Sequence, residues 1–290
     1  MNMMIKNARD VIEKAGLNWK VRKSDVFFNG NFGVEEYKDS KAIVREDNGQ
    51  VLGIVGSRYV PIQNESVFEF LDKFIDNEDV YYSKANSYKD GRVISVDISL
   101  SREDRHTVRV GDDIETLIRV ITSHDGSERL SARLLVNRLV CQNGLVRPNT
   151  CFAFNTKHTL NAGKAINNGF DLINVARVFG KEMAETARRM ANTTTTSAKQ
   201  REYILKVLNV TEEAIGTKQE NKLEEIIALA NNGKGNVGRT LWDNYNGVTE
   251  YADYHIRTRG DNDRLTSSVL GSGLVLKERA YTIAQEFITV

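Results

Sequence analysis

Proline and cysteine are nearly absent from this sequence. Its 290 residues include two prolines and two cysteines, Cys141 and Cys151. Two cysteines are too few for a framework of disulfides, and with only four histidines a metal site built from Cys and His is not expected. No run approaches the roughly 18 apolar residues of a membrane-spanning helix. We therefore expect a cytoplasmic protein in a reducing compartment, without a bound metal or other cofactor.

Neither sign of charge is in excess. The chain has 40 basic and 39 acidic residues, so its formal net charge is +1 at pH 7. A protein that coats duplex DNA usually carries a large basic surplus, so any contact with nucleic acid must come from a local patch. The N-terminal residues 1–16 lack the apolar stretch of a signal peptide and predict a short amphipathic helix.

The first half of the chain is patterned as strands. Two turn signals, each between two β-patterned runs, predict hairpins at Asn48-Gly49 and at Lys89-Asp90-Gly91. After the second turn, polar and apolar residues alternate over 92–100, which predicts a half-buried strand. One helix interrupts the strands, and Asn64 is expected to cap it before residues 65–76.

The second half is patterned as helices. Helical periodicity and capping residues predict helices over 170–190, 199–208, 223–230, 239–256 and 261–288, the last of them split at Gly271-Ser272-Gly273. We expect an α+β fold with a twisted, mainly antiparallel sheet that is packed by helices. A β-rich domain over 1–165 would be followed by a helical region over 166–290, either with its own core or packed on the first.

A predicted hairpin around Asp125-Gly126 concentrates positive charge. From Leu117 to Lys164 seven basic residues face two acidic ones, a local balance of +5: Arg119, Arg129, Arg133, Arg138, Arg147, Lys157 and Lys164. In its second strand arginine, serine and asparagine alternate with apolar residues, so one face can contact phosphates while the other packs a core. With a two-residue turn Arg119 falls opposite Ala132 on the apolar face, so it lies at the sheet margin or the register differs.

A second basic cluster lies near the N-terminus. Lys20, Arg22 and Lys23 follow Trp19, which offers an aromatic ring for stacking beside the positive charge. Tyr82, which lies in the predicted hairpin around Lys89-Asp90-Gly91, is a further candidate for stacking. The alternative for each of these residues is a solvated side chain or a core aromatic ring.

Patterns typical of enzymes are incomplete. Ser123–Ser127 crowds His, Asp and Ser into one turn, where they cannot form a catalytic relay. The segment Gly233–Thr240 lacks the spacing of a phosphate-binding loop, although one phosphate can bind at the helix start that follows. Asp112, Asp113 and Glu115 lie in a predicted turn, either as a divalent-ion site or as a solvated acidic loop.

Several segments in order resemble a known family. They are 53–64 (GIVGSRYVPIQN), 122–127 (TSHDGS), 140–145 (VCQNGL), 240–242 (TLW) with 246–251 (NGVTEY), and 270–273 (LGSG) with 276–280 (LKERA). Together they resemble the phage/plasmid-like protein family, a family of unknown function carried by bacteriophages, prophages and conjugative plasmids. The resemblance implies a mobile-element protein in the bacterial cytoplasm.

At the level of architecture alone, the expected layout is also similar to the ring-forming single-strand annealing recombinases of phages. That likeness implies a non-enzymatic, homo-oligomeric protein that holds single-stranded DNA in a basic groove. With the local balance of +5 and the incomplete enzyme patterns, it predicts that Arg119, Arg129, Arg133 and Arg138 bind the DNA backbone and that Arg147, Lys157 and Lys164 line the groove. Lys20 and Arg22 are further candidates for phosphate contacts, and Trp19 or Tyr82 would stack on bases. Two alternatives stay open. One is a counter-defence protein that binds a host defence or restriction complex, and the other is a metal-dependent nuclease that uses Asp112, Asp113 and Glu115.

Overall fold

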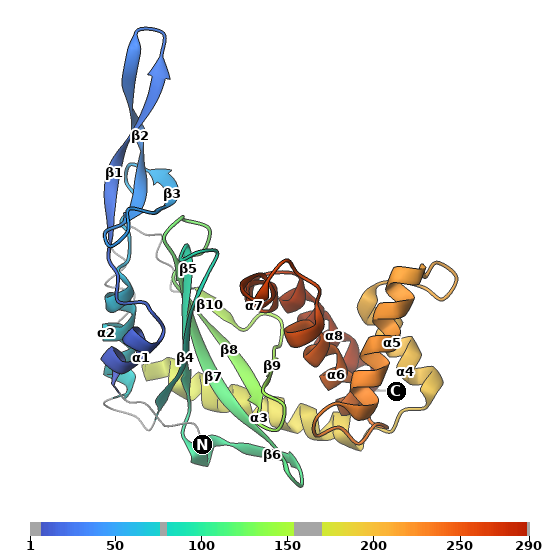
Figure 1. The fold of residues 1–290 in the computed structure, drawn as a ribbon. Helices are drawn as coiled ribbons and strands as arrows, with labels where there is room; N and C mark the ends of the chain where they lie inside the picture. Colours follow the sequence, from blue (N-terminus) through green and yellow to red (C-terminus); the bar gives the residue numbers. More distant parts are fainter. Residues whose placement is uncertain (1–6, 76–79, 154–169, 289–290) are drawn as a thin grey trace. The chain divides into compact units, whose positions relative to one another are not determined.

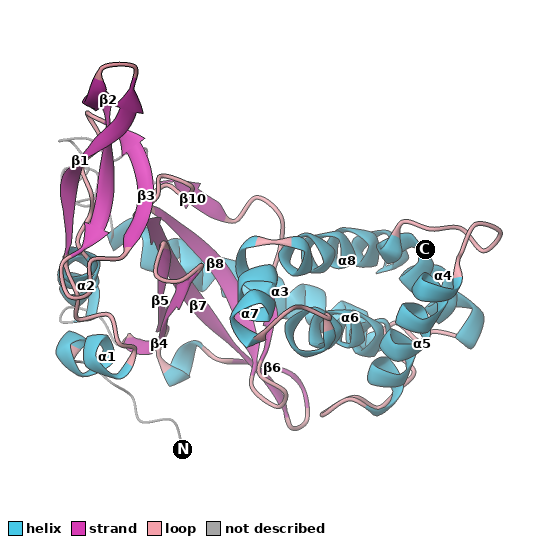
Figure 2. Ribbon diagram, turned by 45° about the horizontal axis from the view of Figure 1, so that its top comes forward, coloured by secondary structure: helices cyan, strands magenta, loops and turns pink. Residues whose placement is uncertain are grey.

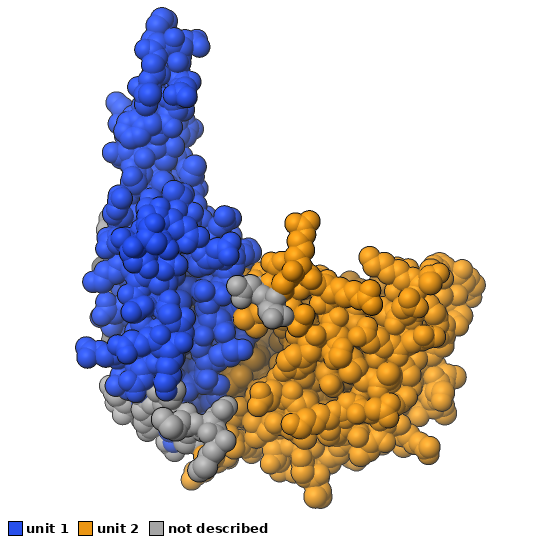
Figure 3. All heavy atoms as spheres, viewed as in Figure 1, with its two compact units in different colours: residues 1–101, 118–133, 151–174 blue, residues 102–117, 134–150, 175–290 orange. Residues whose placement is uncertain are grey.

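The computed structural model describes residues 7–75, 80–153 and 170–288. Its α+β fold is the expected one, with two antiparallel sheets followed by helices (Figure 1). By their contacts the residues divide into two compact units, coloured separately in Figure 3. Unit 1 comprises 1–101, 118–133 and 151–174, and unit 2 comprises 102–117, 134–150 and 175–290. The predicted border at 165/166 falls within the residues that the structure leaves undescribed.

The first sheet belongs to unit 1 and has three strands in the order β1-β2-β3. They are β1 (Val21–Gly30), β2 (Gly33–Arg45) and β3 (Val51–Gly56). The predicted Asn48-Gly49 turn joins β2 to β3, where the side chain of Asn48 accepts from Gln50 N and Gly49 has a φ of 74°. β1 was not predicted, and with β2 it forms a two-stranded ribbon that extends beyond the rest of unit 1 (Figure 2).

The second sheet has the order β10-β8-β7-β5-β4, with β6 beside β7 and β9 beside β8. Its strands are β4 (Tyr81–Tyr88), β5 (Val93–Ser99), β6 (His106–Arg109), β7 (Asp112–Ser123), β8 (Ser131–Arg138), β9 (Asn143–Leu145) and β10 (Cys151–Ala153). A short 3-10 turn, Arg102–Asp104, precedes β6. The predicted Lys89–Gly91 turn joins β4 to β5.

Two predictions for this sheet are wrong. Seven residues, 124–130, separate β7 from β8, so the hairpin does not turn on Asp125-Gly126 alone. β5 is buried on both faces rather than on one. Its polar side chains are paired inside the sheet, because Asp97 binds Arg119 of β7 and Ser95 shares a hydrogen bond with the hydroxyl of Tyr88.

Two helices pack within unit 1. α1 (Ala8–Lys14) contacts β4 and α2 (Asn64–Ile75), and α2 contacts β5. α3 (Phe170–Asn192) begins in unit 1 and continues into unit 2. The helices of unit 2 are α4 (Ser197–Leu208), α5 (Thr217–Asn232), α6 (Leu241–Glu250), α7 (Asp261–Leu270) and α8 (Ser272–Ile288), with a π-helical turn at Tyr251–His255. The predicted break at Gly271-Ser272-Gly273 separates α7 from α8, and the side chain of Thr196 caps α4.

Candidate nucleic-acid interface

The second predicted basic cluster lies on an extended segment that joins α1 to β1. Lys14–Lys23, here called the basic segment, contains four cations and no acid. Its side chains alternate, since Leu17, Trp19 and Val21 are buried whereas Asn18, Lys20 and Arg22 are exposed. This alternation follows from extended backbone, in which successive side chains point to opposite sides. The segment thus buries its apolar residues in unit 1 and turns its cations to solvent.

Two amide side chains at the start of α2 hold the basic segment in this conformation. Gln63 accepts from the backbone N–H of Val21 at 3.0 Å and donates to the carbonyl oxygen of the same residue at 2.8 Å. Asn64 Nδ2 donates to the carbonyls of Leu17 and Trp19 at 3.0 and 3.3 Å. The side chain of Asn64 therefore binds a distant backbone and does not cap α2 as predicted.

His124 completes this arrangement. Its Nε2 lies 2.9 Å from Asn64 Oδ1, and because the amide nitrogen of Asn64 already donates to two carbonyls, the imidazole is the donor. The loop that carries His124 is itself held by β3 and the residues after it. Gly53 is needed there, since a Cβ would lie 2.8 Å from the Cα of Asp125, and the hydroxyl of Tyr59 donates to Ser123 O at 2.7 Å. Two motifs of the resemblance, 53–64 with Gly53 and Asn64 and 122–127 with His124, therefore converge on the basic segment.

Asn64→Leu is expected to lower the free energy of unfolding by about 2–3 kcal/mol. Leucine has a similar volume but leaves two buried carbonyls and the imidazole of His124 without their partner, and each unsatisfied buried group is costly. Chemical denaturation of the purified protein measures the change. Asn18→Leu, at an exposed position of the same segment, is the control and should change stability by less than about 0.5 kcal/mol. Equal losses for the two variants would contradict the assigned role.

The aromatic rings predicted for base stacking are not available at the surface. Trp19 is buried, with its Nε1 donating to Gly16 O at 3.0 Å and the guanidinium of Arg45 4.3 Å from a ring centroid. Tyr82 is also buried, and its hydroxyl binds Asp72 at 2.7 Å. Both predictions are corrected on this ground, because a buried ring that already has partners cannot stack on a nucleotide.

The arginines predicted along the central hairpin are not brought together on one surface. Arg119 is bound to Asp97 by two hydrogen bonds of 2.7 and 2.6 Å, and Arg147 pairs with Glu182 at 2.7 Å. Arg133 is half-buried and Arg129 is exposed in the 124–130 loop. Lys157 and Lys164 lie outside the described residues. Of the described cations proposed for the DNA backbone, Lys20, Arg22 and Arg129 are exposed.

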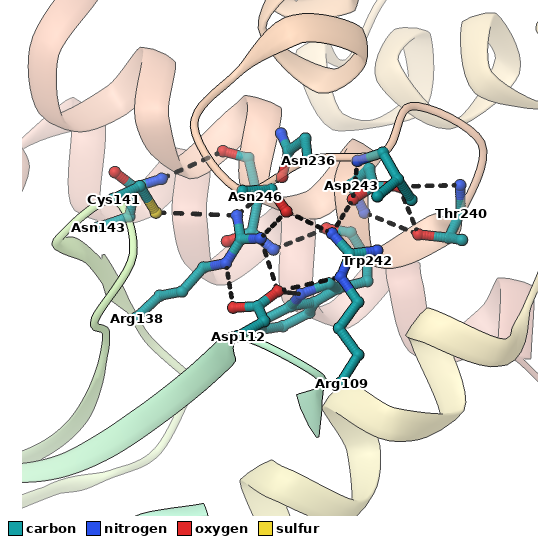
Figure 4. A network of polar contacts seen from close by, with 12 residues as sticks. Arg109, Asp112, Arg138, Cys141, Asn143, Asn236, Thr240, Trp242, Asp243 and Asn246 are labelled. Carbon is teal, nitrogen blue, oxygen red and sulfur yellow. Dashed lines mark hydrogen bonds and ion pairs between the residues drawn. The ribbon is translucent and has the colours of Figure 1, made fainter. Parts of the chain in front are cut away.

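Arg138 instead forms the centre of a buried polar network in unit 2 (Figure 4). Its guanidinium binds both carboxylate oxygens of Asp112, at 2.7 and 2.6 Å, and it also reaches Asn236 Oδ1 and Gly235 O, each at 2.7 Å. Trp242 Nε1 donates to Asp112 at 2.9 Å. Because Arg138 has no exposed surface, its predicted contact with a DNA backbone is wrong.

Arg109 links this network to the start of α6. It donates to Asp243 Oδ1 at 2.6 Å, and Asp243 forms a capping box with Thr240. Burial raises the pKa of Asp243, but hydrogen bonds from Arg109 and Thr240 outweigh it, so the pKa lies below its ordinary value. Arg109 and Arg138 therefore hold the Gly233–Thr240 segment and the start of α6 against the sheet.

The three carboxylates considered for a divalent ion lie on β7 and have separate partners. Asp112 binds Arg138, Asp113 accepts from Thr107 at 2.7 Å, and Glu115 accepts from Arg105 at 3.0 Å. They are not in a turn as predicted. Among residues 7–75, 80–153 and 170–288, no group of three His, Cys, Asp or Glu side chains is placed to hold a metal ion. No helix in the same residues is long and apolar enough to cross a membrane.

Fold and surface together define an α+β protein with an exposed basic segment and a second unit that is built around buried ion pairs. The chain belongs to the family described as Domain of unknown function (DUF932), which it matches over residues 51–269. No curated protein and no solved structure matches it. The family match includes Gln63, Asn64 and His124, whereas the basic segment that they hold precedes it.

Proposed function

We propose that the chain is a non-enzymatic, single-stranded-DNA-binding protein of the annealing type, carried by a bacterial mobile element, and that the basic segment is its contact with the DNA backbone. One observation carries the proposal. The half-buried amide of Gln63 and the buried amide of Asn64 fix the segment so that Lys20 and Arg22 face solvent. These amides belong to a motif that resembles the phage/plasmid-like family, which supports the mobile-element context.

The chemistry of the segment fits phosphate rather than base recognition. Arg22 offers a planar guanidinium that can bind a phosphate with two hydrogen bonds, and Lys20 adds a point charge on the same side of the segment. Lys23 is also exposed, with its Nζ donating to Ser57 O at 2.7 Å. Contacts of this kind do not read the base sequence, and their strength falls steeply with salt. The proposal therefore entails sequence-tolerant, salt-sensitive binding, as an annealing protein requires.

Replacing Lys20, Arg22 and Lys23 with alanine is expected to weaken single-strand binding about tenfold or more at low salt. If each cation contacts one phosphate, the slope of log K against log salt becomes shallower by about 2, because each contact with single-stranded DNA contributes about 0.7. Fluorescence anisotropy with a labelled single-stranded oligonucleotide, across a salt series and beside a duplex control, measures both quantities.

The matched control removes three exposed cations from unit 2. Arg189, Lys199 and Lys218 are exposed, and their replacement by alanine changes the net charge by the same amount. This variant should keep the slope and affinity of the parent chain. Equal effects of the two triple variants would mean that only overall charge matters. Absence of binding by the parent at low salt would reject the proposal and favour the counter-defence alternative, which is tested by co-purification from nuclease-treated host lysate.

A further inference from the structure

The ribbon tip, defined as residues 25–39, exposes an unusual amount of apolar surface. Five of its six large apolar side chains are substantially exposed, Phe32 fully so, and Val26 is half-buried; the exposed five are Phe27, Phe28, Phe32, Val34 and Tyr37. They lie on both faces of the ribbon, because Phe27 is paired with Glu36 and the next residue, Phe28, with Glu35. Figure 3 shows the tip standing clear of the rest of unit 1. A two-stranded ribbon is marginally stable alone in water, and an apolar patch of this kind marks an interaction site.

The charge of the ribbon tip argues against nucleic acid as its occupant. Residues 25–39 contain four acids, Asp25, Glu35, Glu36 and Asp39, and one cation, Lys38, a net charge of −3. Lys41, just beyond the tip on β2, pairs with Asp25 and Glu36, and the tip with this lysine included is still acidic. A polyanion would be repelled, whereas an apolar surface edged with cations would be complementary to the tip.

The other end of the same ribbon is a surface of this kind. The strand register places Arg22, Val44 and Val51 in one cross-strand row and Ser24, Ala42 and Ile54 in the next. Arg22, Val51 and Ile54 are exposed on this face, here called the ribbon base. Lys20 and Lys23 lie beside it in sequence. The ribbon base therefore combines exposed apolar side chains with the positive charge that the tip lacks.

A ribbon tip cannot reach the base of its own chain. Phe28 lies six positions after Arg22 along β1. At about 3.3 Å per residue, the two residues are roughly 20 Å apart. We propose that the ribbon tip of one copy docks on the ribbon base of a second copy of this chain. Two antiparallel ribbons make both contacts at once, which closes the assembly as a two-fold dimer.

This inference rests on the proposed function in one respect. Arg22 binds either the ribbon tip of the second copy or the DNA backbone. The acidic, aromatic tip therefore competes with single-stranded DNA for this arginine. Self-association itself does not depend on DNA. Release of the tip is then the step that exposes the DNA-binding surface.

Light scattering coupled to size exclusion, on the full chain without DNA, tests self-association. We expect the parent chain to be dimeric, and both a tip variant, Phe28→Asp with Phe32→Asp, and a base variant, Arg22→Glu with Ile54→Asp, to be monomeric. Mixing the two variants restores one intact contact, so a tagged tip variant should capture the base variant. Val178→Asp, an exposed apolar position on α3, is the control and should stay dimeric. Circular dichroism confirms that each variant is folded.

A monomeric parent chain at about 100 µM, or a dimer that survives both variants, would overturn the inference. So would a tip variant that loses DNA binding, since the tip would then contact nucleic acid, or a monomeric parent that captures a host protein through its tip. The expected result is a several-fold increase in the DNA affinity of the tip variant, with release of monomer when oligonucleotide is added to the parent. A dimer that binds no DNA would reject the proposed function and leave the docking contact standing.

Discussion

Arg138→Ala is expected to lower the free energy of unfolding by about 3–5 kcal/mol, the usual cost of removing one partner of a buried ion pair. The variant leaves the carboxylate of Asp112, itself almost completely buried, with only Trp242 Nε1 at 2.9 Å and the more distant Nε of Arg109 at 3.3 Å. Asn236 Oδ1 also loses its donor, and the carbonyl of Gly235 keeps only Arg109, at 2.6 Å. The free energy of unfolding of a whole domain is about 5–15 kcal/mol. The loss expected from this one substitution is therefore a large share of it.

Chemical denaturation measures the effect as a shift of the transition midpoint with little change in slope. Arg147→Ala is the control, since Arg147 and Glu182 are both partly exposed, with 34% and 51% of their side-chain surface accessible. It should cost about 1 kcal/mol or less. Arg138→Lys keeps the charge but cannot form the paired hydrogen bonds, and should fall between the two. A loss for Arg138→Ala no greater than that of the control would show that the network does not stabilise unit 2.

The pairing of Arg138 and Arg119 with buried carboxylates shows what a local count of charge cannot reveal. Over residues 117–164 the positive charges outnumber the negative, but the carboxylates that neutralise these two arginines, Asp97 and Asp112, precede that window. They are brought in by neighbouring strands of the sheet. The pairing depends on strand order, which no sequence window contains, so the predicted basic surface did not form along the hairpin.

Local signals were more successful. The Asn48-Gly49 and Lys89–Gly91 turns, the helix α3 and the break between α7 and α8 each depend on a few adjacent residues, and all are confirmed. The Asp125-Gly126 signal was misleading because the loop around it is held by distant groups, among them Tyr59. The turn residues are compatible with a tight hairpin, but the tertiary contacts select a longer loop.

The candidate interface was predicted in part. Charge at Lys20 and Arg22 could be read from the sequence, and these residues are exposed. The alternation of apolar Leu17, Trp19 and Val21 with polar neighbours was the available signal that Trp19 is buried. The role of Asn64 had no such signal, because an asparagine before a helix is usually a cap and its true partners are over 40 residues away.

Gly247→Ala is expected to destabilise the protein by about 2 kcal/mol, the opposite sign from its effect on an isolated helix. Glycine inside a helix costs about 1 kcal/mol relative to alanine, and Gly247 lies within α6, so propensity alone favours the substitution. A Cβ at this position would, however, lie 2.7 Å from Ala230 N and 2.9 Å from Ala230 Cα on α5. The two helices must therefore move apart. Overpacking of a core costs about 1–3 kcal/mol. Because the close contacts are with backbone atoms, we expect the upper end of this range, which exceeds the gain of about 1 kcal/mol in helix propensity.

Two further variants separate this clash from a general effect of alanine. At Gly56 on β3 an added Cβ meets nothing within 4 Å, so Gly56→Ala should leave the denaturation midpoint unchanged or raise it. Ala230→Gly combined with Gly247→Ala removes the methyl group of residue 230 but not its backbone nitrogen and Cα, so the double variant should remain destabilised. Full recovery in the double variant would mean that side chains, not backbones, set the distance between α5 and α6. A loss greater than that of Ala230→Gly alone, which itself places a glycine in α5, would place the close approach of the two backbones among the contacts on which unit 2 depends.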